Sequence, residues 1–400
     1  MLIATGKLPL DSLSGTVALV TGAGRGIGFE AARSLAALGA HVIIAEIDDA
    51  TGGKAAAAIS EELGAGMAAY VKTDVGSEES VAHLKLRAHA LFDKVDVVLN
   101  NATTTPMGAV KDRPINDWDT SYRVNLRGPV LLAQAFLPGM IARNAGVFVC
   151  VSSVGQAYMG AYECFKAAQV HLAETLDAEL DATKVYAFAI GPGLVRTPGA
   201  MAGITQLAPM YGKTVDEFFD MGKEHIITPE QAGAGFAAAI VLASQFRGQE
   251  ISSTQALIAA GIPIAGRAEA GESADLAPAQ KAKALALCRS IRVTLAEQSA
   301  GWAKRSLFER QWVIRDFRKT AGMPADQWLA SLDELTKAIE ERGRSAWHSA
   351  PPLDKLADYY DHLAKLAAGY EKNLEKLNEQ LAVVKRWEEE ARELAALIRT

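Results

Sequence analysis

The feature that most constrains the fold is an alternation that runs from Thr16 to about Ile262. Short β-branched runs take turns with longer stretches rich in Ala and Leu. This is the pattern of repeated units in which a strand is followed by a crossover helix. The short runs are almost continuously apolar, as expected for strands buried on both faces of a parallel sheet.

Six strand candidates are clear and a seventh is weaker. The six span residues 16–22, 41–47, 67–75, 95–102, 146–153 and 184–191, and the weaker one spans 255–261. Helix candidates separate them, including a long stretch from Asn116 to Ala142. With right-handed crossovers, the sequence predicts an α/β fold with a Rossmann-type doubly wound parallel sheet of about seven strands.

The composition changes after Pro263, which indicates a domain boundary. Residues 1–264 form the predicted α/β domain, and 265–277 form an Ala/Gly/Glu linker without periodicity. Residues 278–400 contain only helical patterns, broken near Gly322 and near Pro351. We therefore expect an all-α C-terminal extension.

The last segment of the extension, residues 353–400, carries a heptad stripe of apolar residues. Its members are Leu356, Tyr360, Leu363, Ala367, Tyr370, Leu374, Leu377, Leu381 and Val384, and the spacing then slips by one position to Trp387, Ala391, Leu394 and Ile398. A narrow stripe favours a coiled-coil-like helix that forms a hairpin or an oligomer seam, although packing on the chain's own core is the alternative. Self-association through this helix is a prediction.

Composition and charge exclude several classes of protein. Of the 400 residues 22% are charged, and the net charge of −6 argues against a nucleic-acid partner. Three scattered cysteines suggest neither a disulfide framework nor a zinc site, and the seven histidines form no metal pattern. No leader or membrane span stands out, so a cytoplasmic protein without a membrane partner is expected.

The segment TGAGRGIG, residues 21–28, follows the first strand candidate and opens the first helix candidate. Gly22 permits a tight turn, Gly26 allows the backbone to approach a pyrophosphate, and Gly28 allows close packing of helix on sheet. The free amides of the helix N-terminus favour negative charge. The position of this turn predicts nucleotide binding.

Glu46 ends the second strand candidate, where the adenosine ribose of a dinucleotide is expected. A carboxylate accepts hydrogen bonds from ribose hydroxyls and repels a 2′-phosphate, which favours NAD over NADP. Arg25 in the glycine turn could instead meet that phosphate. The sequence leaves both cofactors open, with NAD preferred.

These motifs resemble the short-chain dehydrogenase/reductase family over about residues 14–263. The spacing TGxxxGxG is followed in order by Asp74-Val75, Asn100-Asn101-Ala102, Val124-Asn125-Leu126 and Gly191-Pro192-Gly193. The resemblance implies a set of cofactor-binding residues. They are Gly22, Arg25, Gly26, Ile27, Gly28, Glu46, Asp74, Val75, Asn101, Ala102, Tyr162, Lys166, Pro192, Gly193, Val195 and Thr197.

The same resemblance implies a catalytic group of Ser153, Tyr162, Lys166 and Asn125. Tyr162 and Lys166 are four residues apart and share a face on a helix. A nearby ammonium is expected to lower the pKa of the phenol, so that Tyr162 serves as general acid or base. As the resemblance implies, Lys166 holds the nicotinamide ribose, Ser153 polarises the substrate oxygen, and Asn125 holds a water.

Two residues and one spacing depart from the family pattern. Thr103 replaces a glycine, Cys150 replaces an asparagine, and only nine positions separate Ser153 from Tyr162. The shortened loop affects where the catalytic serine lies and how the pocket wall is shaped. Ser152 is the alternative catalytic serine.

The sequence therefore predicts an enzyme, an NAD(P)-dependent oxidoreductase that acts on a secondary alcohol or ketone. A lid is expected between Pro198 and Thr228, and its apolar side chains either select a hydrophobic or acyl substrate or fasten the lid to the core. The resemblance implies a homodimer or homotetramer. The alternative function is a catalytically impaired NAD-binding scaffold whose helical extension mediates protein interaction.

Overall fold

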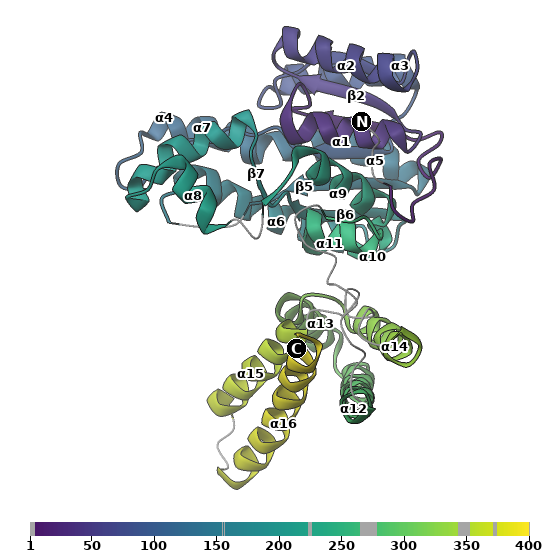
Figure 1. The fold of residues 1–400 in the computed structure, drawn as a ribbon, viewed down its shortest axis with the longest axis vertical. Coiled ribbons are helices and arrows are strands. Elements are labelled where there is room, and N and C mark those ends of the chain that lie inside the picture. The colour runs from purple at the N-terminus through teal and green to yellow at the C-terminus, as the bar shows by residue number, and fades with distance from the viewer. Residues whose placement is uncertain are drawn as a thin grey trace. The chain divides into compact units, whose positions relative to one another are not determined.

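The computed structural model describes residues 5–153, 155, 157–222, 226–264, 278–342, 353–370 and 374–399 (Figure 1). The chain forms two compact units, Met1–Arg267 and Ala268–Thr400. The predicted linker, 265–277, lies outside the described residues, and the predicted domain boundaries stay a prediction.

The first unit is built on a seven-stranded parallel sheet with the order β3-β2-β1-β4-β5-β6-β9. The strands are β1 (Val17–Thr21), β2 (His41–Glu46), β3 (Ala68–Lys72), β4 (Val97–Asn100), β5 (Gly146–Val151), β6 (Val185–Gly191) and β9 (Glu250–Ser252). The order reverses between β1 and β4, where a doubly wound sheet opens a crevice for a ligand. The predicted fold class is confirmed.

Helices cover both faces of this sheet. One face is covered by α1 (Gly26–Ala37), α2 (Asp49–Leu63), α9 (Pro229–Val241), α10 (Ala243–Phe246) and α11 (Ser253–Ala259), and the other by α3 (Glu78–Phe92), α5 (Gly128–Arg143) and α6 (Gly160–Glu179). Each face has its own apolar core, and Leu19, Ile43 and Phe148 are fully buried. The continuous apolar strands are thus explained by burial on both sides.

The seventh strand differs from the prediction. It is β9, and the predicted run 255–261 begins within α11 instead. Ser252 and Gln255 form a capping box, in which each side chain bonds the other residue's backbone amide. This pairing starts a helix immediately after a three-residue strand.

The long predicted helix from Asn116 to Ala142 is continuous but irregular. It consists of α4 (Ile115–Tyr122), the π-helical turn η1 (Arg123–Arg127) and α5. A π-bulge widens the helix locally and is common at functional sites. Asn125 lies in this turn and is completely buried.

After β6 the chain builds a small subdomain beside the sheet (Figure 1). It contains β7 (Leu194–Val195), α7 (Pro198–Leu207), the 3-10 turn η2 (Ala208–Tyr211), α8 (Val215–Met221) and β8 (Ile226–Ile227), which pairs with β7. These elements occupy the segment predicted to be the lid.

The second unit contains five helices among its described residues. They are α12 (Pro278–Trp302), α13 (Leu307–Ala321), α14 (Ala325–Arg342), α15 (Leu353–Tyr370) and α16 (Leu374–Arg399). Their shared core includes Leu295, Trp328 and Tyr360. Gly322 ends α13 in a left-handed conformation, as the predicted break required.

The heptad stripe lies on two helices rather than on one. Leu356 and Tyr360 on α15, and Ala391 and Leu394 on α16, are buried in the core of this unit. The α15–α16 pair therefore packs against α12 and α13 of its own chain. Self-association remains a prediction.

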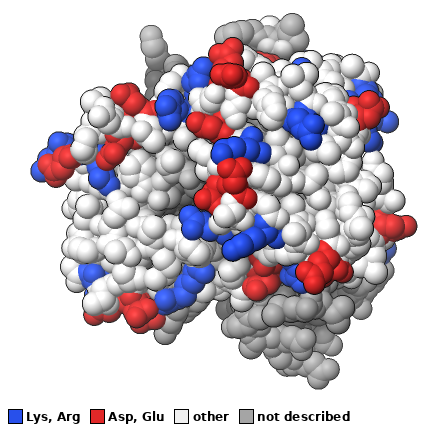
Figure 2. All heavy atoms as spheres, turned by 90° about the horizontal axis from the view of Figure 1, so that it is seen from above, with Lys and Arg blue, Asp and Glu red and all other residues white. Residues whose placement is uncertain are grey.

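Acidic and basic side chains are interspersed on the face seen in Figure 2. Pairs within the first unit include Arg33 with Glu30 and Glu62. Among the described residues, no helix is long and apolar enough to cross a bilayer. The same residues contain no cluster of three potential metal ligands.

Candidate active site

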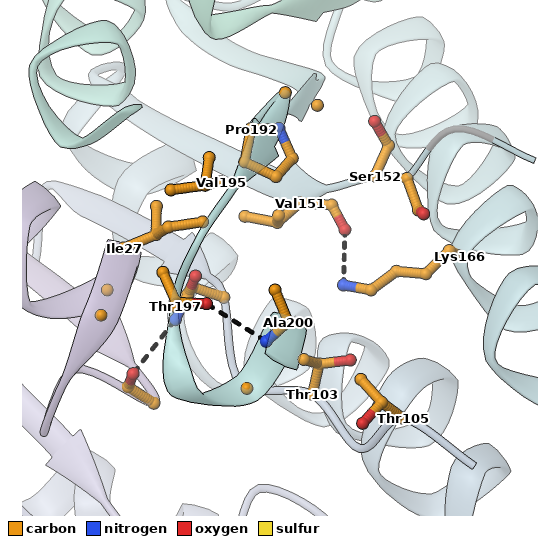
Figure 3. A pocket seen from close by; sticks show the side chains of 18 of the residues that line it. Ile27, Thr103, Thr105, Val151, Ser152, Lys166, Pro192, Val195, Thr197 and Ala200 are labelled. Carbon is orange, nitrogen blue, oxygen red and sulfur yellow. Dashed lines mark hydrogen bonds between the residues drawn. The ribbon is translucent and has the colours of Figure 1, made fainter. Parts of the chain in front are cut away.

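A cavity of about 1230 Å³ extends from the glycine turn to the lid. Every cofactor-binding residue predicted from the sequence lines it, as do Ser153, Tyr162 and Lys166. Figure 3 shows part of this lining, with Ile27, Val195 and Thr197 on one side and Ser152 and Lys166 on the other. Asn125 is not part of the lining and lies behind it.

Two of the glycines that the sequence singled out, Gly22 and Gly28, have no room for a side chain, and Gly26 has a positive φ of +61°. Gly22 has a φ of +63°, and a Cβ there would lie 2.9 Å from Ala102 Cα. A Cβ on Gly28 would lie 2.4 Å from the Gly22 carbonyl oxygen. Arg25 begins α1 without a side-chain cap, so its first amides remain available to an anion.

Glu46 is fixed against this turn. Its Oε2 accepts from the Gly24 amide at 3.0 Å, and its Oε1 accepts from the Ile47 amide at 2.8 Å. The Asp48 amide also donates to Oε1, at 3.3 Å. A carboxylate offers about four acceptor positions, so one remains for a ribose hydroxyl.

The ends of β1 and β4 are tied together beside the turn. Asn101 Nδ2 donates to the carbonyl oxygens of Thr21 and Gly22, at 2.9 and 3.1 Å. The Thr21 hydroxyl accepts from the amides of Asn101 and Ala102. Sequence reasoning missed Thr21, whose only signal is that it opens the TGxxxGxG segment.

Asn125 is held entirely by protein groups. Its Nδ2 donates to Ser121 Oγ and to the Thr104 carbonyl oxygen, while its Oδ1 accepts from Thr103 Oγ1 and the Thr104 amide. Thr103, the departure from the family glycine, thus supports Asn125. The main-chain oxygen of Asn125 accepts from Gln169 Nε2.

Gln169 was not predicted, although it lies three residues after Lys166 on the same helix. Its Oε1 accepts from Asn100 Nδ2 at 3.0 Å, so one buried amide connects the end of β4 with η1. Its only sequence signal was a polar residue one turn beyond Lys166. The sequence predicted that Asn125 holds a water. Its main-chain oxygen already accepts one hydrogen bond from the protein, donated by Gln169.

Tyr162 and Lys166 lie together on α6, with the Lys166 ammonium 5.9 Å from the centre of the Tyr162 ring. Lys166 is 1% exposed, and its Nζ donates to the Val151 carbonyl oxygen at 2.7 Å (Figure 3). Burial lowers the pKa of Lys166 to about 8. The buried thiol of Cys150 lies near it and has a pKa raised to about 12.

The expectation that Lys166 lowers the pKa of Tyr162 is wrong for this structure. The pKa of Tyr162 is raised, chiefly because burial disfavours the phenolate, and a hydrogen bond from Ser153 opposes this only partly. The physical reason is that the ammonium points at the Val151 carbonyl rather than at the phenolic oxygen. A protonated phenol is suited to donating a proton.

Ser153 lowers the pKa of Tyr162, although burial outweighs this effect. Ser152 is 2% exposed, and its Oγ has no hydrogen-bond partner. Both serines line the cavity. The proximity to Tyr162 favours Ser153 as the substrate-facing hydroxyl.

Side chains of the lid both line the cavity and fasten the lid to the rest of the unit. Ile204, Leu207 and Phe218 line the cavity. Phe219 is buried within the lid and packs under the Arg196 guanidinium, 4.0 Å from its ring centre. The Tyr211 hydroxyl donates to the Ala157 carbonyl oxygen at 2.8 Å, which joins the lid to the segment between Ser153 and Tyr162.

The fold and the cavity define a class of protein, a doubly wound dinucleotide-binding α/β protein with its site at the switch point of the sheet. The family model for short chain dehydrogenase matches residues 16–207. The chain belongs to the short-chain dehydrogenase/reductase family of oxidoreductases.

Three relatives illustrate the likeness. Dehydrogenase/reductase SDR family member 4 of Bos taurus is 36% identical over 47% of this chain and 68% of its own length. L-sorbose reductase from Gluconobacter frateurii, complexed with NADPH, has a TM-score of 0.55 and 25% identity over 60% of this chain and 96% of its own. A 3-ketoacyl-(acyl-carrier-protein) reductase from Brucella melitensis, complexed with NADH, has a TM-score of 0.53 and 26% identity over 60% and 97%.

If Tyr162 is the general base that the sequence predicts, alcohol oxidation is expected to accelerate with pH, because the pKa of Tyr162 is raised. Below that pKa the phenolate fraction rises about tenfold per pH unit. The value of kcat/KM for oxidation should therefore climb from pH 6 to 10 without a plateau. A plateau near neutrality in steady-state assays would contradict this prediction.

Proposed function

We propose that this protein is an NAD(H)-dependent oxidoreductase that moves a hydride between nicotinamide and a secondary alcohol or ketone. The observation that carries the proposal is one continuous cavity that joins the glycine turn and Glu46 to Tyr162 and Lys166. The glycines that a Cβ would obstruct, and the uncapped start of α1, suit a dinucleotide. The nicotinamide, when bound, accepts or supplies the hydride.

In this proposal the protein's own side chains handle the proton and the orientation. Tyr162 donates its proton to the substrate oxygen in reduction, and in oxidation it removes the proton of the substrate hydroxyl. Ser153 donates a hydrogen bond to the same oxygen, and Lys166 binds the nicotinamide ribose. Asn125 and Gln169 keep η1 and α6 in register, which supports the position of Lys166.

The substrate end of the cavity favours an uncharged, hydrophobic substrate. Of the described residues that line the cavity, the charged ones are Arg25, Glu46, Asp74 and Lys166, which belong to the proposed cofactor half. The lid contributes Ile204, Leu207, Phe218 and Met221 instead. Burying even a neutral polar group there without a hydrogen-bond partner would cost roughly 2–7 kcal/mol, and an unpaired charge would cost more.

The test is turnover of a panel of ketones and secondary alcohols, followed by the absorbance of NADH. The panel should include matched pairs that differ only in a carboxylate, and the neutral member of each pair is expected to react faster. NAD(H) binding without any turnover would favour the alternative, a binding scaffold that acts through its helical extension. If the protein neither bound NAD(H) nor turned over any substrate, both the oxidoreductase and the scaffold function would be contradicted.

A further inference from the structure

The part of the cavity beside Tyr162 is closed by two methionine side chains. Met107 and Met159 are buried, line the cavity and belong to one apolar cluster with Leu207. The ring of Tyr162 packs against the same cluster. A substrate whose oxygen meets the Tyr162 hydroxyl therefore places one of its two substituents toward these methionines.

The backbone holds the two methionines next to each other. The Gly108 amide donates to the Tyr158 carbonyl oxygen at 2.7 Å. This bond joins the residue directly after Met107 to the residue directly before Met159. Gly160 has a φ of +53°, and a Cβ there would lie 2.9 Å from the Gly108 carbonyl oxygen. The two segments therefore cannot separate without breaking a close backbone contact.

The lid supports this wall from behind. A Cβ on Gly203 of α7 would lie 2.8 Å from Met107 Cε, so the end of the thioether lies directly against the glycine. Tyr211 packs against the same cluster, and its ring centre lies 5.6 Å from that of Tyr158 and 5.7 Å from that of Phe218. The methionines consequently have little space into which they can retreat from a bulky substituent.

Another part of the cavity wall is open to solvent. Met221 of α8 also lines the cavity, and 57% of this residue is exposed. The cavity is therefore closed beside Met107 and Met159 and open beside Met221. Both parts have apolar walls, but a long substituent has room to extend only through the open one.

We propose that Met107 and Met159 are specificity-determining residues, which restrict the substituent on their side of the carbonyl to a small, unbranched apolar group. The larger substituent extends toward Met221. The substrate class is then an unsymmetrical ketone with one short alkyl group, or the matching secondary alcohol. This inference rests on the proposed function, because it requires the substrate oxygen to lie at Tyr162.

Two variants should change the selectivity in opposite directions. Met159→Ala removes part of the wall and should lower the preference for a methyl over an isopropyl ketone by about 10- to 200-fold in kcat/KM. Gly203→Ala adds a methyl group where Met107 Cε lies, so the flexible thioether moves toward the cavity and the preference rises. Alanine is a better helix former than glycine, so this variant should fold.

The test compares kcat/KM for a methyl ketone and an isopropyl ketone that share the second substituent, using the full-length chain and NADH. Met210→Ala is the matched control, since this methionine is exposed on the lid, and it should keep the wild-type ratio. Adding Gly203→Ala to Met107→Ala should not change the ratio further, because the side chain that it displaces is absent.

NADH affinity, followed by fluorescence, should stay within about twofold in every variant, which separates selectivity from damage to the cofactor half. The inference is overturned if the wild type prefers the isopropyl ketone, or if Met159→Ala keeps the wild-type ratio. It is also overturned if Gly203→Ala acts equally without the Met107 side chain. Failure of the wild type to reduce any ketone would instead refute the proposed function, and the inference with it.

Discussion

Replacing Tyr162 with Phe is expected to lower kcat for ketone reduction by about 10²- to 10⁴-fold, the usual contribution of a positioned general acid. The substitution removes one hydroxyl, which carries its proton at neutral pH and has a pKa raised further by burial. The ring that packs with Met107, Met159 and Leu207 would remain. The loss should therefore appear in chemistry rather than in folding.

A binding measurement and a control variant distinguish a loss of chemistry from damage to the cavity. NADH binding, followed by fluorescence, should stay within about twofold, because a uniform loss of binding would instead indicate a damaged cavity. Tyr158→Phe is the matched control, since this exposed tyrosine lies four residues earlier in the same segment. Equal turnover by Tyr162→Phe and the wild type would contradict the assignment of Tyr162 as acid and base.

The sheet was predictable because its strands are buried on both faces, which leaves continuous apolar runs in the sequence. The six clear candidates correspond to β1 through β6. The seventh was misplaced because β9 has three residues, too few to produce a pattern. The capping pair Ser252 and Gln255 was a helix signal available in the sequence.

The cofactor end of the site was more predictable than the proton-transfer end. Its residues occur in contiguous blocks whose order carries the information, and all of them line one cavity. The Asn125–Gln169 pair joins residues on different elements, and no local pattern specifies it. The direction of Lys166 likewise depends on the Val151 carbonyl, a tertiary contact.

The heptad stripe illustrates the same limit. Some of its members are buried, including Leu356, Tyr360 and Leu394, whereas Leu363 and Val384 are only partly buried. It did not reveal that the stripe divides between α15 and α16, because an apolar spacing of three and four is compatible with one long helix or with two paired ones. Residues 371–373, between the two helices, lie outside the described residues.

Replacing Glu46 with Ala is expected to shift cofactor preference toward NADPH by about 5- to 150-fold, measured as the ratio of the Kd values of NADPH and NADH. In the proposed complex this carboxylate accepts from a ribose hydroxyl, and a 2′-phosphate at the same place would meet like charge. Repulsion between such groups near a protein surface amounts to about 1–3 kcal/mol. Asp49→Ala removes a nearby, exposed carboxylate and should leave the ratio unchanged.

Arg25 decides how large the shift becomes. Both Arg25 and Glu46 line the cavity, and without the carboxylate the Arg25 guanidinium offers a cation to a 2′-phosphate. Adding Arg25→Ala to Glu46→Ala should therefore remove most of the gain in NADPH affinity while leaving NADH affinity nearly constant. If instead Glu46→Ala weakened both cofactors equally, Glu46 would act by supporting the glycine turn through the Gly24 and Ile47 amides, and the charge argument for NAD would be wrong.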